Sequence, residues 1–216
     1  MTDDFPYGKT FYVMRHAKTN DNEKGMASGG KSQAYLVEEG KKQAKQAGDI
    51  IEKLRDKIDL VVTSEMQRTK DTAKISFDRD SLRNIKHIAD AGINERDYGL
   101  GEGLSEKRRR EFKELGGFVD GEESKDELRA RVSYVVKRYL GESKSPLFVT
   151  HGGVVLRLIG IAIGGEKAVD ELKKRGRLVN NCDIYEFKTP EKKNGKWQVN
   201  LITLDKDRNI LRLPLV

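Results

Sequence analysis

Two segments far apart in the chain each end an apolar run of strand length at a histidine. The first is FYVMRHAKT at residues 11–19, and the second is PLFVTHGG at residues 146–153. If both runs are parallel strands of one sheet, their carboxyl ends share an edge where open α/β sheets bind ligands. His16 and His151 would then face each other across one pocket, with Arg15 before the first histidine and glycines after the second. Two imidazoles beside a cation, with glycines that let the backbone approach a ligand closely, indicate phosphate chemistry.

Two further segments complete the constellation. A third apolar run ends at Thr63 and Ser64, which form a good N-cap pair, and the predicted helix after them carries Arg68 one turn in. A loop punctuated by glycines, INERDYGLGEG at residues 93–103, holds Glu95. The set therefore offers a nucleophile, two cationic clamps and a proton donor.

With these residues in place, the chain resembles the histidine phosphatase superfamily, which includes cofactor-dependent phosphoglycerate mutases and many small phosphatases. The family's Arg-His-Gly motif is RHA here, at residues 15–17. Further stretches resemble family motifs in the expected order: LVEEGKKQA at 36–44, SEMQRTKDTA at 64–73, GEES at 121–124 and NNCDIYEF at 180–187. The resemblance covers nearly the whole chain and implies a phosphoglycerate mutase-like fold.

The chain also departs from the family pattern. Ala17 replaces the usual glycine, Lys18 replaces the usual acid, and no arginine or glutamine lies between Gly25 and Gly30. These departures concern the identity of the substrate more than the chemistry. The residues expected to bind substrate are Thr19, Asn22, Ser28, Gly29, Tyr98 and Gly152.

The expected chemistry follows from the charge of a phosphate ester. An imidazole with a pKa near ~6.5 is largely neutral at pH 7, and guanidinium groups beside it disfavour its protonation further. His16 can therefore attack phosphorus and become a phosphohistidine. Arg15 and Arg68 would bind the phosphate oxygens, and His151 would help to hold the transferring group. The resemblance assigns protonation of the leaving oxygen to Glu95, with Glu102 as the next candidate.

Length and composition predict one domain over residues 1–216. The chain has 216 residues, 36% of them hydrophobic and 36% charged. Cys182 is the only cysteine, which excludes an internal disulfide and fits a reducing compartment. No apolar N-terminal segment or long uncharged span occurs, so we expect a cytoplasmic protein without membrane contact.

The net charge of +7 does not point to nucleic acid. The basic residues are interleaved with acids, and few aromatic residues are spaced among them for base stacking. We expect the partner to be a phosphorylated small molecule or a phosphoprotein. The sequence leaves the oligomeric state open.

Apolar patterning predicts an α/β fold, a three-layer α/β/α arrangement around a mainly parallel sheet. The expected strands are residues 10–15, 58–63, 85–89, 146–150, 183–188 and 196–204, and the expected helices are residues 39–56, 65–76 and 124–140. The glycine-rich stretch from 92 to 123 is expected to form a lid. We assign His87 and Cys182 to structure, and the arginines at 108–110 to a solvated helix face.

One competing motif points to a nucleotide. GMASGGKS, residues 25–32, satisfies the P-loop pattern of glycine, four residues, glycine, lysine and serine. A P-loop begins where a strand ends, yet TNDNEK separates this motif from the apolar strand, and no later strand ends in the expected aspartate. We therefore expect a polar loop near the pocket mouth. The titratable residues show no metal-ligand spacing, so neither a metal nor another cofactor is expected.

Three functions remain in order of preference. The first is metal-independent hydrolysis of a phosphomonoester through a phosphohistidine at His16. The second is a phosphoglycerate mutase. Mutases carry a long insertion between the acid and the second histidine, whereas His151 follows Glu95 by 56 positions (151 − 95), which favours the phosphatase. The third is a catalytically silent binding protein on the same fold.

Overall fold

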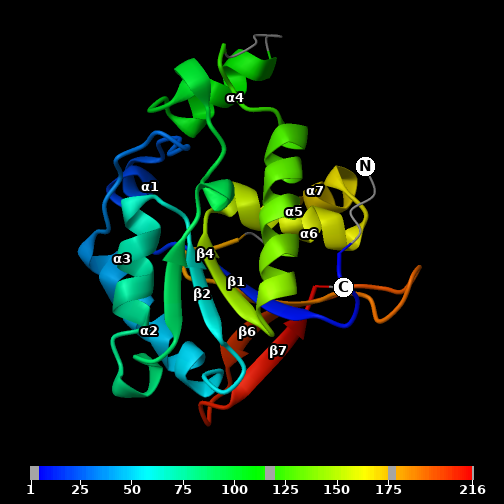
Figure 1. The fold of residues 1–216 in the computed structure, drawn as a ribbon. Coiled ribbons are helices and arrows are strands. Elements are labelled where there is room, and N and C mark those ends of the chain that lie inside the picture. The colour runs from blue at the N-terminus through cyan, green and yellow to red at the C-terminus, as the bar shows by residue number, and fades with distance from the viewer. Residues whose placement is uncertain (1–4, 115–119, 175–178, 216) are drawn as a thin grey trace.

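The computed structural model describes residues 5–114, 120–174 and 179–215 and has a seven-stranded sheet at its centre (Figure 1). The strands are β1 (Thr10–Arg15), β2 (Leu60–Thr63), β3 (Lys86–Ala89), β4 (Pro146–Thr150), β5 (Ile184–Lys188), β6 (Gln198–Leu204) and β7 (Ile210–Pro214). Their order across the sheet is β3-β2-β4-β1-β5-β6-β7. All six expected strands are present, and β7 was not expected.

The sheet has a parallel half and an antiparallel half. Strands β3, β2, β4 and β1 are parallel, while β5, β6 and β7 continue the sheet as an antiparallel ribbon. Short loops can join only antiparallel neighbours, whereas each parallel pair needs a crossover. The α/β class with a parallel centre is therefore confirmed, and the antiparallel edge is an addition to it.

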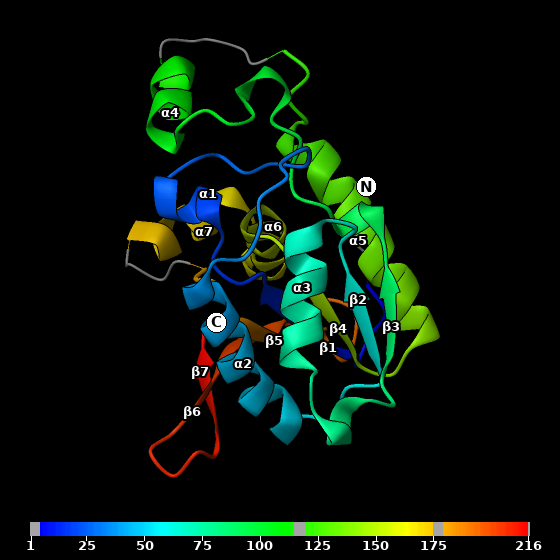
Figure 2. The ribbon, with the colours of Figure 1, turned by 90° about the vertical axis from the view of Figure 1, so that its left-hand side faces the viewer.

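Helices cover both faces of the sheet (Figures 1 and 2). They are α1 (Asn20–Lys24), α2 (Glu38–Lys53), α3 (Gln67–Ser76), α4 (Glu106–Glu114), α5 (Lys125–Glu142), α6 (Gly152–Ile163) and α7 (Glu166–Lys174). Because side chains alternate along a strand, Tyr12 and Met14 of β1 pack in the core beneath α2 and α3, whereas Phe11 and Val13 pack beneath α5 and α6. The three-layer prediction is confirmed.

Local signals account for the helix ends near the site. Ser124 and Glu127 form a capping box at the start of α5, and each side chain accepts from the other residue's backbone N–H. Helix α6 follows β4 directly, so its first turn starts at the carboxyl edge of the parallel strands. This helix was not expected from the sequence, because its apolar run GGVVLRLIGIAI has no polar face to mark a helical period.

The expected lid segment lies at the end of the molecule where the parallel strands stop (Figures 1 and 2). It contains short 3-10 turns at Ala91–Ile93 and Gly99–Gly101, followed by α4. Isolated bridges join Met26 to Ser105 and Tyr98 to Glu122. Residues 115–119 of the segment lie outside the described residues, and its action as a lid stays a prediction.

Candidate active site

The sheet register brings the two strand-end histidines together. Met14 of β1 pairs with Val149 of β4, and Arg15 pairs with Thr150, so the next residue of each strand is a histidine. The rings of His16 and His151 lie with centroids 5.2 Å apart and planes at 61°. Both are buried, with 3% and 0% of their surface exposed.

One ring nitrogen of His16 is held by its own neighbourhood. Nδ1 lies 2.8 Å from the carbonyl oxygen of Ala17, and a carbonyl can only accept, so Nδ1 donates. In the neutral imidazole the lone pair is therefore on Nε2. That nitrogen has no hydrogen-bond partner in the part of the chain that the structure describes, so it is the atom of this ring suited to attack phosphorus.

His151 differs from His16, since both of its ring nitrogens are engaged. Nδ1 accepts from Nε of Arg68 at 3.2 Å, which leaves Nε2 as the protonated nitrogen. Nε2 lies 2.8 Å from Oγ of Ser64, and that oxygen lies 2.7 Å from Oγ1 of Thr69. Thr69 in turn donates to the carbonyl oxygen of Met66 at 2.7 Å. This chain of donors fixes the tautomer and orientation of His151.

The environment keeps both histidines uncharged. Burial lowers the pKa of His16 well below its usual 6.5, and the guanidinium groups of Arg68 and Arg15 lower it further. Burial and the charge of Arg68 lower the pKa of His151 in the same way. A neutral imidazole retains the lone pair that nucleophilic attack requires.

Arg15 contributes an unsatisfied donor beside these rings. Its Nη1 donates to the carbonyl oxygen of Val179 at 2.7 Å, while its Nε is buried without a partner among the described residues. A Cβ atom placed on Gly152 would lie 3.4 Å from that Nε, so the donor faces the first turn of α6. A helix start and a free guanidinium donor together favour an anion at this place.

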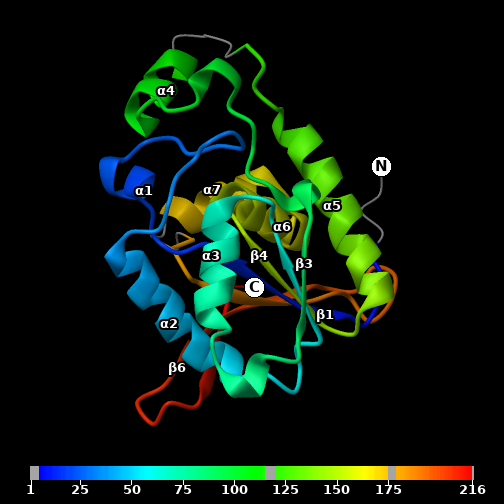
Figure 3. The same ribbon diagram turned by 60° about the vertical axis from the view of Figure 1, so that its left-hand side comes forward.

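Arg68 is fully buried, with 1% of its surface exposed, and holds a loop. Its Nη2 donates to the carbonyl oxygens of Ser28 and Gly29 at 3.2 and 3.1 Å, and its Nη1 donates to that of Ser32 at 3.3 Å. The loop after α1 runs beneath α4 and over the start of α3 (Figure 3). In this structure Arg68 thus binds the stretch with the P-loop pattern. Its action as a phosphate clamp stays a prediction.

Glu95 reaches the same edge from the expected lid. Its two carboxylate oxygens accept from the backbone N–H groups of Gly153 at 3.0 Å and Arg96 at 2.9 Å. A Cβ atom on Gly153 would come within 2.3 Å of Oε1 of Glu95, so a larger residue there would displace the Glu95 carboxylate. Glu95 therefore lies at the N-terminus of α6, close to both histidine-bearing strand ends.

Glu102, the second candidate acid, has a different position. Its carboxylate accepts from the N–H groups of Gly29 at 2.9 Å and of Lys31 and Tyr98 at 3.3 Å. These bonds tie the loop after α1 to the lid segment. Lys31 is 67% exposed and forms an ion pair with Asp97 at 2.8 Å. Neither Glu102 nor Lys31 contacts the two histidines.

A residue that the sequence analysis missed positions Glu95. Arg131 of α5 donates to the carbonyl oxygens of Gly92, Asn94 and Glu95 at 3.0, 2.8 and 3.1 Å. It also forms a two-bond ion pair with Glu123, at 2.6 and 2.9 Å. The helical stripe predicted α5, but an arginine on its polar side carries no signal of a distant loop.

The expected substrate-binding residues occupy structural positions around the site. Thr19 and Asn22 form a capping box on α1, and Asn181 donates to Oδ1 of Asn22 at 3.2 Å and to the carbonyl oxygen of His16 at 2.8 Å. Ser28 and Gly29 lie on the loop bound by Arg68. Their contact with a substrate stays a prediction.

The ring of Tyr98 lies 3.7 Å from the guanidinium carbon of Arg109. Arg108 and Arg110 are exposed as expected, but Arg109 is not part of a solvated face, because it packs on this ring and approaches Glu122 at 3.7 Å.

Cys182 is half-buried, and burial raises the pKa of its thiol to about 12. A raised pKa keeps the thiol protonated, which fits the structural role that the sequence indicates.

Residues 11–203 match the family model of the histidine phosphatase superfamily (branch 1). The chain belongs to this superfamily. It is 32% identical over 97 residues to a 2,3-bisphosphoglycerate-dependent phosphoglycerate mutase of Bartonella bacilliformis, a match covering 45% of this chain and 47% of that mutase. The chain thus spans about half the length of the curated relatives it matches first.

A broad-specificity phosphatase of Saccharomyces cerevisiae is 24% identical over 156 residues, covering 68% of this chain and 67% of the yeast protein. The solved structure of a phosphoglycerate mutase from Bacillus anthracis superposes with a TM-score of 0.71 at 19% identity, over 92% of this chain and 94% of that one. The structural likeness supports the fold. The relatives include proteins named as phosphoglycerate mutases and a protein named as a phosphatase.

Neither a membrane-spanning helix nor a metal-binding cluster occurs among the residues that the structure describes. No helix in these ranges is long and apolar enough to cross a membrane. No group of three or more His, Cys, Asp or Glu side chains in them is arranged to hold a metal ion.

The buried neutral histidines predict a pH-dependent stability. Below pH 6.5 the unfolded chain binds protons at His16 and His151 that the folded chain does not, so the free energy of unfolding falls as pH falls. Each histidine lowers the free energy of unfolding by about 1.4 kcal/mol for each pH unit below pH 6.5. Urea unfolding should therefore show a loss of about 2 to 3 kcal/mol between pH 7.5 and 5.5. His16→Gln should lose part of this dependence, and equal stability at both pH values would contradict the assignment.

The bonds of Arg131 predict an effect on catalysis without contact to substrate. Arg131→Ala releases three carbonyls of the Glu95 loop, and misplacement of a catalytic group by about 1 Å lowers kcat by roughly a hundredfold. Lys137→Ala, a cation on the same helix away from this loop, is the matched control and should keep wild-type kcat. Equal kcat values for the two variants would show that Arg131 does not position Glu95.

Proposed function

We propose that the protein hydrolyses a phosphomonoester without a metal ion and that His16 carries the phosphoryl group between two steps. The observation that supports this most is that the two imidazoles differ in their hydrogen bonds. Nε2 of His16 has no partner among the described residues, while both nitrogens of His151 are bound. Only one of the two rings can therefore supply a lone pair without first losing a hydrogen bond.

In the first step, the lone pair of Nε2 of His16 forms a bond to phosphorus, and the bond from phosphorus to the ester oxygen breaks. The free Nε–H of Arg15 and the first turn of α6 stabilise the charge on the phosphoryl oxygens. In the second step water attacks phosphorus, inorganic phosphate leaves, and Nε2 regains its lone pair. His151 stays neutral throughout and acts by holding Arg68.

Glu95 is the proton donor in this proposal. It gives its proton to the leaving alkoxide and takes one back from the attacking water. In its protonated form one carboxyl oxygen becomes a donor, so one of the bonds from Gly153 or Arg96 has to be exchanged for a bond to the substrate. Its bond to the first turn of α6 supports this role, because the phosphoryl group is expected at the same helix end.

A mutase is the second candidate, favoured by the names of several relatives. Such an enzyme returns the phosphoryl group to its product, whereas a phosphatase passes it to water. The two are distinguished by incubation with 3-phosphoglycerate. Release of inorganic phosphate supports the phosphatase, and accumulation of 2-phosphoglycerate supports the mutase.

The experiment that tests the proposal measures release of phosphate from p-nitrophenyl phosphate in excess EDTA. We expect full activity of the wild type under chelation and no detectable turnover of a correctly folded His16→Ala variant. Lys31→Ala should lose little, since Lys31 is exposed and paired with Asp97. Loss of activity in EDTA that magnesium restores, with a matching loss in Lys31→Ala, would instead support the P-loop function.

The role of Glu95 is tested by the leaving group. Glu95→Gln should slow an alkyl phosphate by roughly a hundredfold or more, the usual scale of general acid catalysis. The same variant should lose much less with p-nitrophenyl phosphate, because its phenolate departs without protonation. A displaced loop would slow the reactions of the alkyl phosphate and of p-nitrophenyl phosphate by the same factor. Equal losses on the two substrates would therefore show that Glu95 is not the general acid.

A further inference from the structure

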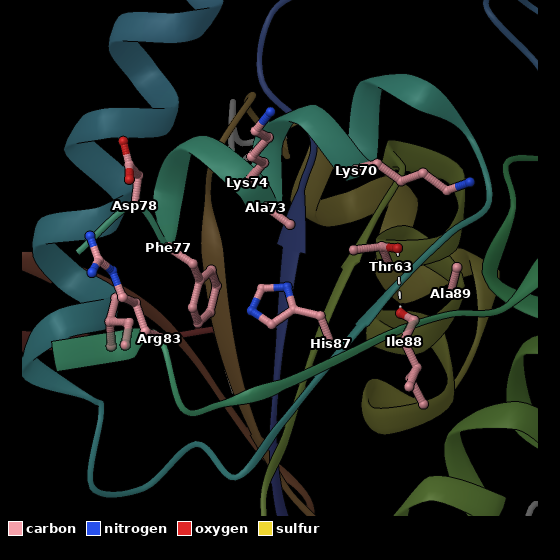
Figure 4. Close-up of a pocket in the computed structure, with 11 residues that line it drawn as sticks. Thr63, Lys70, Ala73, Lys74, Phe77, Asp78, Arg83, His87, Ile88 and Ala89 are labelled. Carbon is pink, nitrogen blue, oxygen red and sulfur yellow. Dashed lines mark hydrogen bonds between the residues drawn. The ribbon is translucent and has the colours of Figure 1, made fainter. Parts of the chain in front are cut away.

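A cleft of about 500 Å³ lies between α3 and the edge strand β3 (Figure 4). Ala73 of α3, Phe77 directly after this helix and Leu82 form its apolar side, and His87 and Ala89 of β3 form the opposite side. The volume is within the range of sites that bind small organic molecules. None of the residues assigned above to phosphoryl transfer lines this cleft, so it is separate from the candidate active site.

The cleft contains an aromatic pair with one accessible ring. The rings of Phe77 and His87 lie with centroids 4.8 Å apart and planes at 88°. Phe77 is buried, whereas His87 is exposed beside it. Burial of part of the imidazole lowers the pKa of His87, so this ring is largely uncharged at neutral pH. The pair thus offers a neutral surface suited to packing against a flat ring.

Two lysines on α3 give the rim a positive charge. Lys70 and Lys74 lie four residues apart on the helix, so they occupy the same face and repel each other. Neither forms an ion pair with any residue that the structure describes, whereas Arg83 is paired with Asp80 at 2.8 Å. Asp78 is the one acid among the lining residues. An anion bound at this rim would meet two ammonium groups that form no ion pair with the described residues.

We propose that this cleft binds a planar aromatic anion, a ring that carries a phosphate, sulfonate or carboxylate group. The ring packs beside Phe77 and His87, and the charged group lies between Lys70 and Lys74. The occupant would also contact the helix that carries Arg68, and Thr63 of the cleft directly precedes Ser64, the partner of His151. The binding itself does not depend on the proposed phosphatase activity.

The test uses 8-anilinonaphthalene-1-sulfonate, an aromatic sulfonate whose fluorescence rises in an apolar site, with the full chain. We expect saturable binding with one site per chain. The double variant K70Q/K74Q keeps good helix formers and should raise Kd at least tenfold. K42Q/K45Q on α2 removes the same charge from exposed positions and should leave Kd within twofold of wild type.

The neutral analogue N-phenyl-1-naphthylamine separates the two halves of the proposal. Its Kd should be the same for wild type and K70Q/K74Q, since it has no charge to place between the lysines. His87→Ala should weaken binding of both compounds. The proposal is overturned if K70Q/K74Q binds the sulfonate as wild type does, if K42Q/K45Q weakens it equally, or if no saturable binding occurs.

Discussion

The rest of the structure depends on one buried positive charge, the guanidinium of Arg68. Burial disfavours that charge and lowers the pKa of Arg68, while Glu95 and Glu102 act in the opposite direction. The donors of the guanidinium are satisfied by backbone carbonyls of the loop after α1 and by His151. A buried charge is tolerated only with such partners, so the loop, Glu95, Glu102 and the second histidine are arranged around it.

This arrangement makes the two histidines chemically different. Arg68 donates to Nδ1 of His151, and Nε2–H of His151 donates to Oγ of Ser64, so this ring is held in one orientation. In contrast, among the described residues His16 is fixed through Nδ1 alone, by the carbonyl of the next residue. Burial lowers the pKa of both rings, and the positive charge of Arg68 lowers it further. One network thus supports the proposed choice of His16 as the nucleophile, because it leaves Nε2 of that ring with an available lone pair.

The sequence was informative wherever short-range patterns carry the structure. Apolar runs that stop at His16 and His151 located two strand ends, and the parallel register then brought the rings together. Strand β7 was missed because its alternation is weak and its side chains are largely exposed. Helix α6 was missed because an apolar helix has no periodic polar face.

The contacts that arrange the site come from distant parts of the chain. Arg131 of α5 bonds the Glu95 loop, and Asn181 bonds the backbone of His16. In each of these contacts a side chain donates to a backbone carbonyl oxygen, and every residue type carries the same carbonyl group. No pattern in the sequence can therefore identify such partners, and they became visible only in the folded chain.

The most direct measurement is the position of the phosphoryl group on the enzyme during turnover. Heteronuclear NMR of the chain quenched with substrate and kept at alkaline pH identifies both the histidine and the ring nitrogen that carries phosphorus. The account predicts phosphorus on Nε2 of His16, since Nδ1 is occupied by the carbonyl of Ala17. Phosphorus on Nδ1 of His16, on His151 or on no histidine would contradict it.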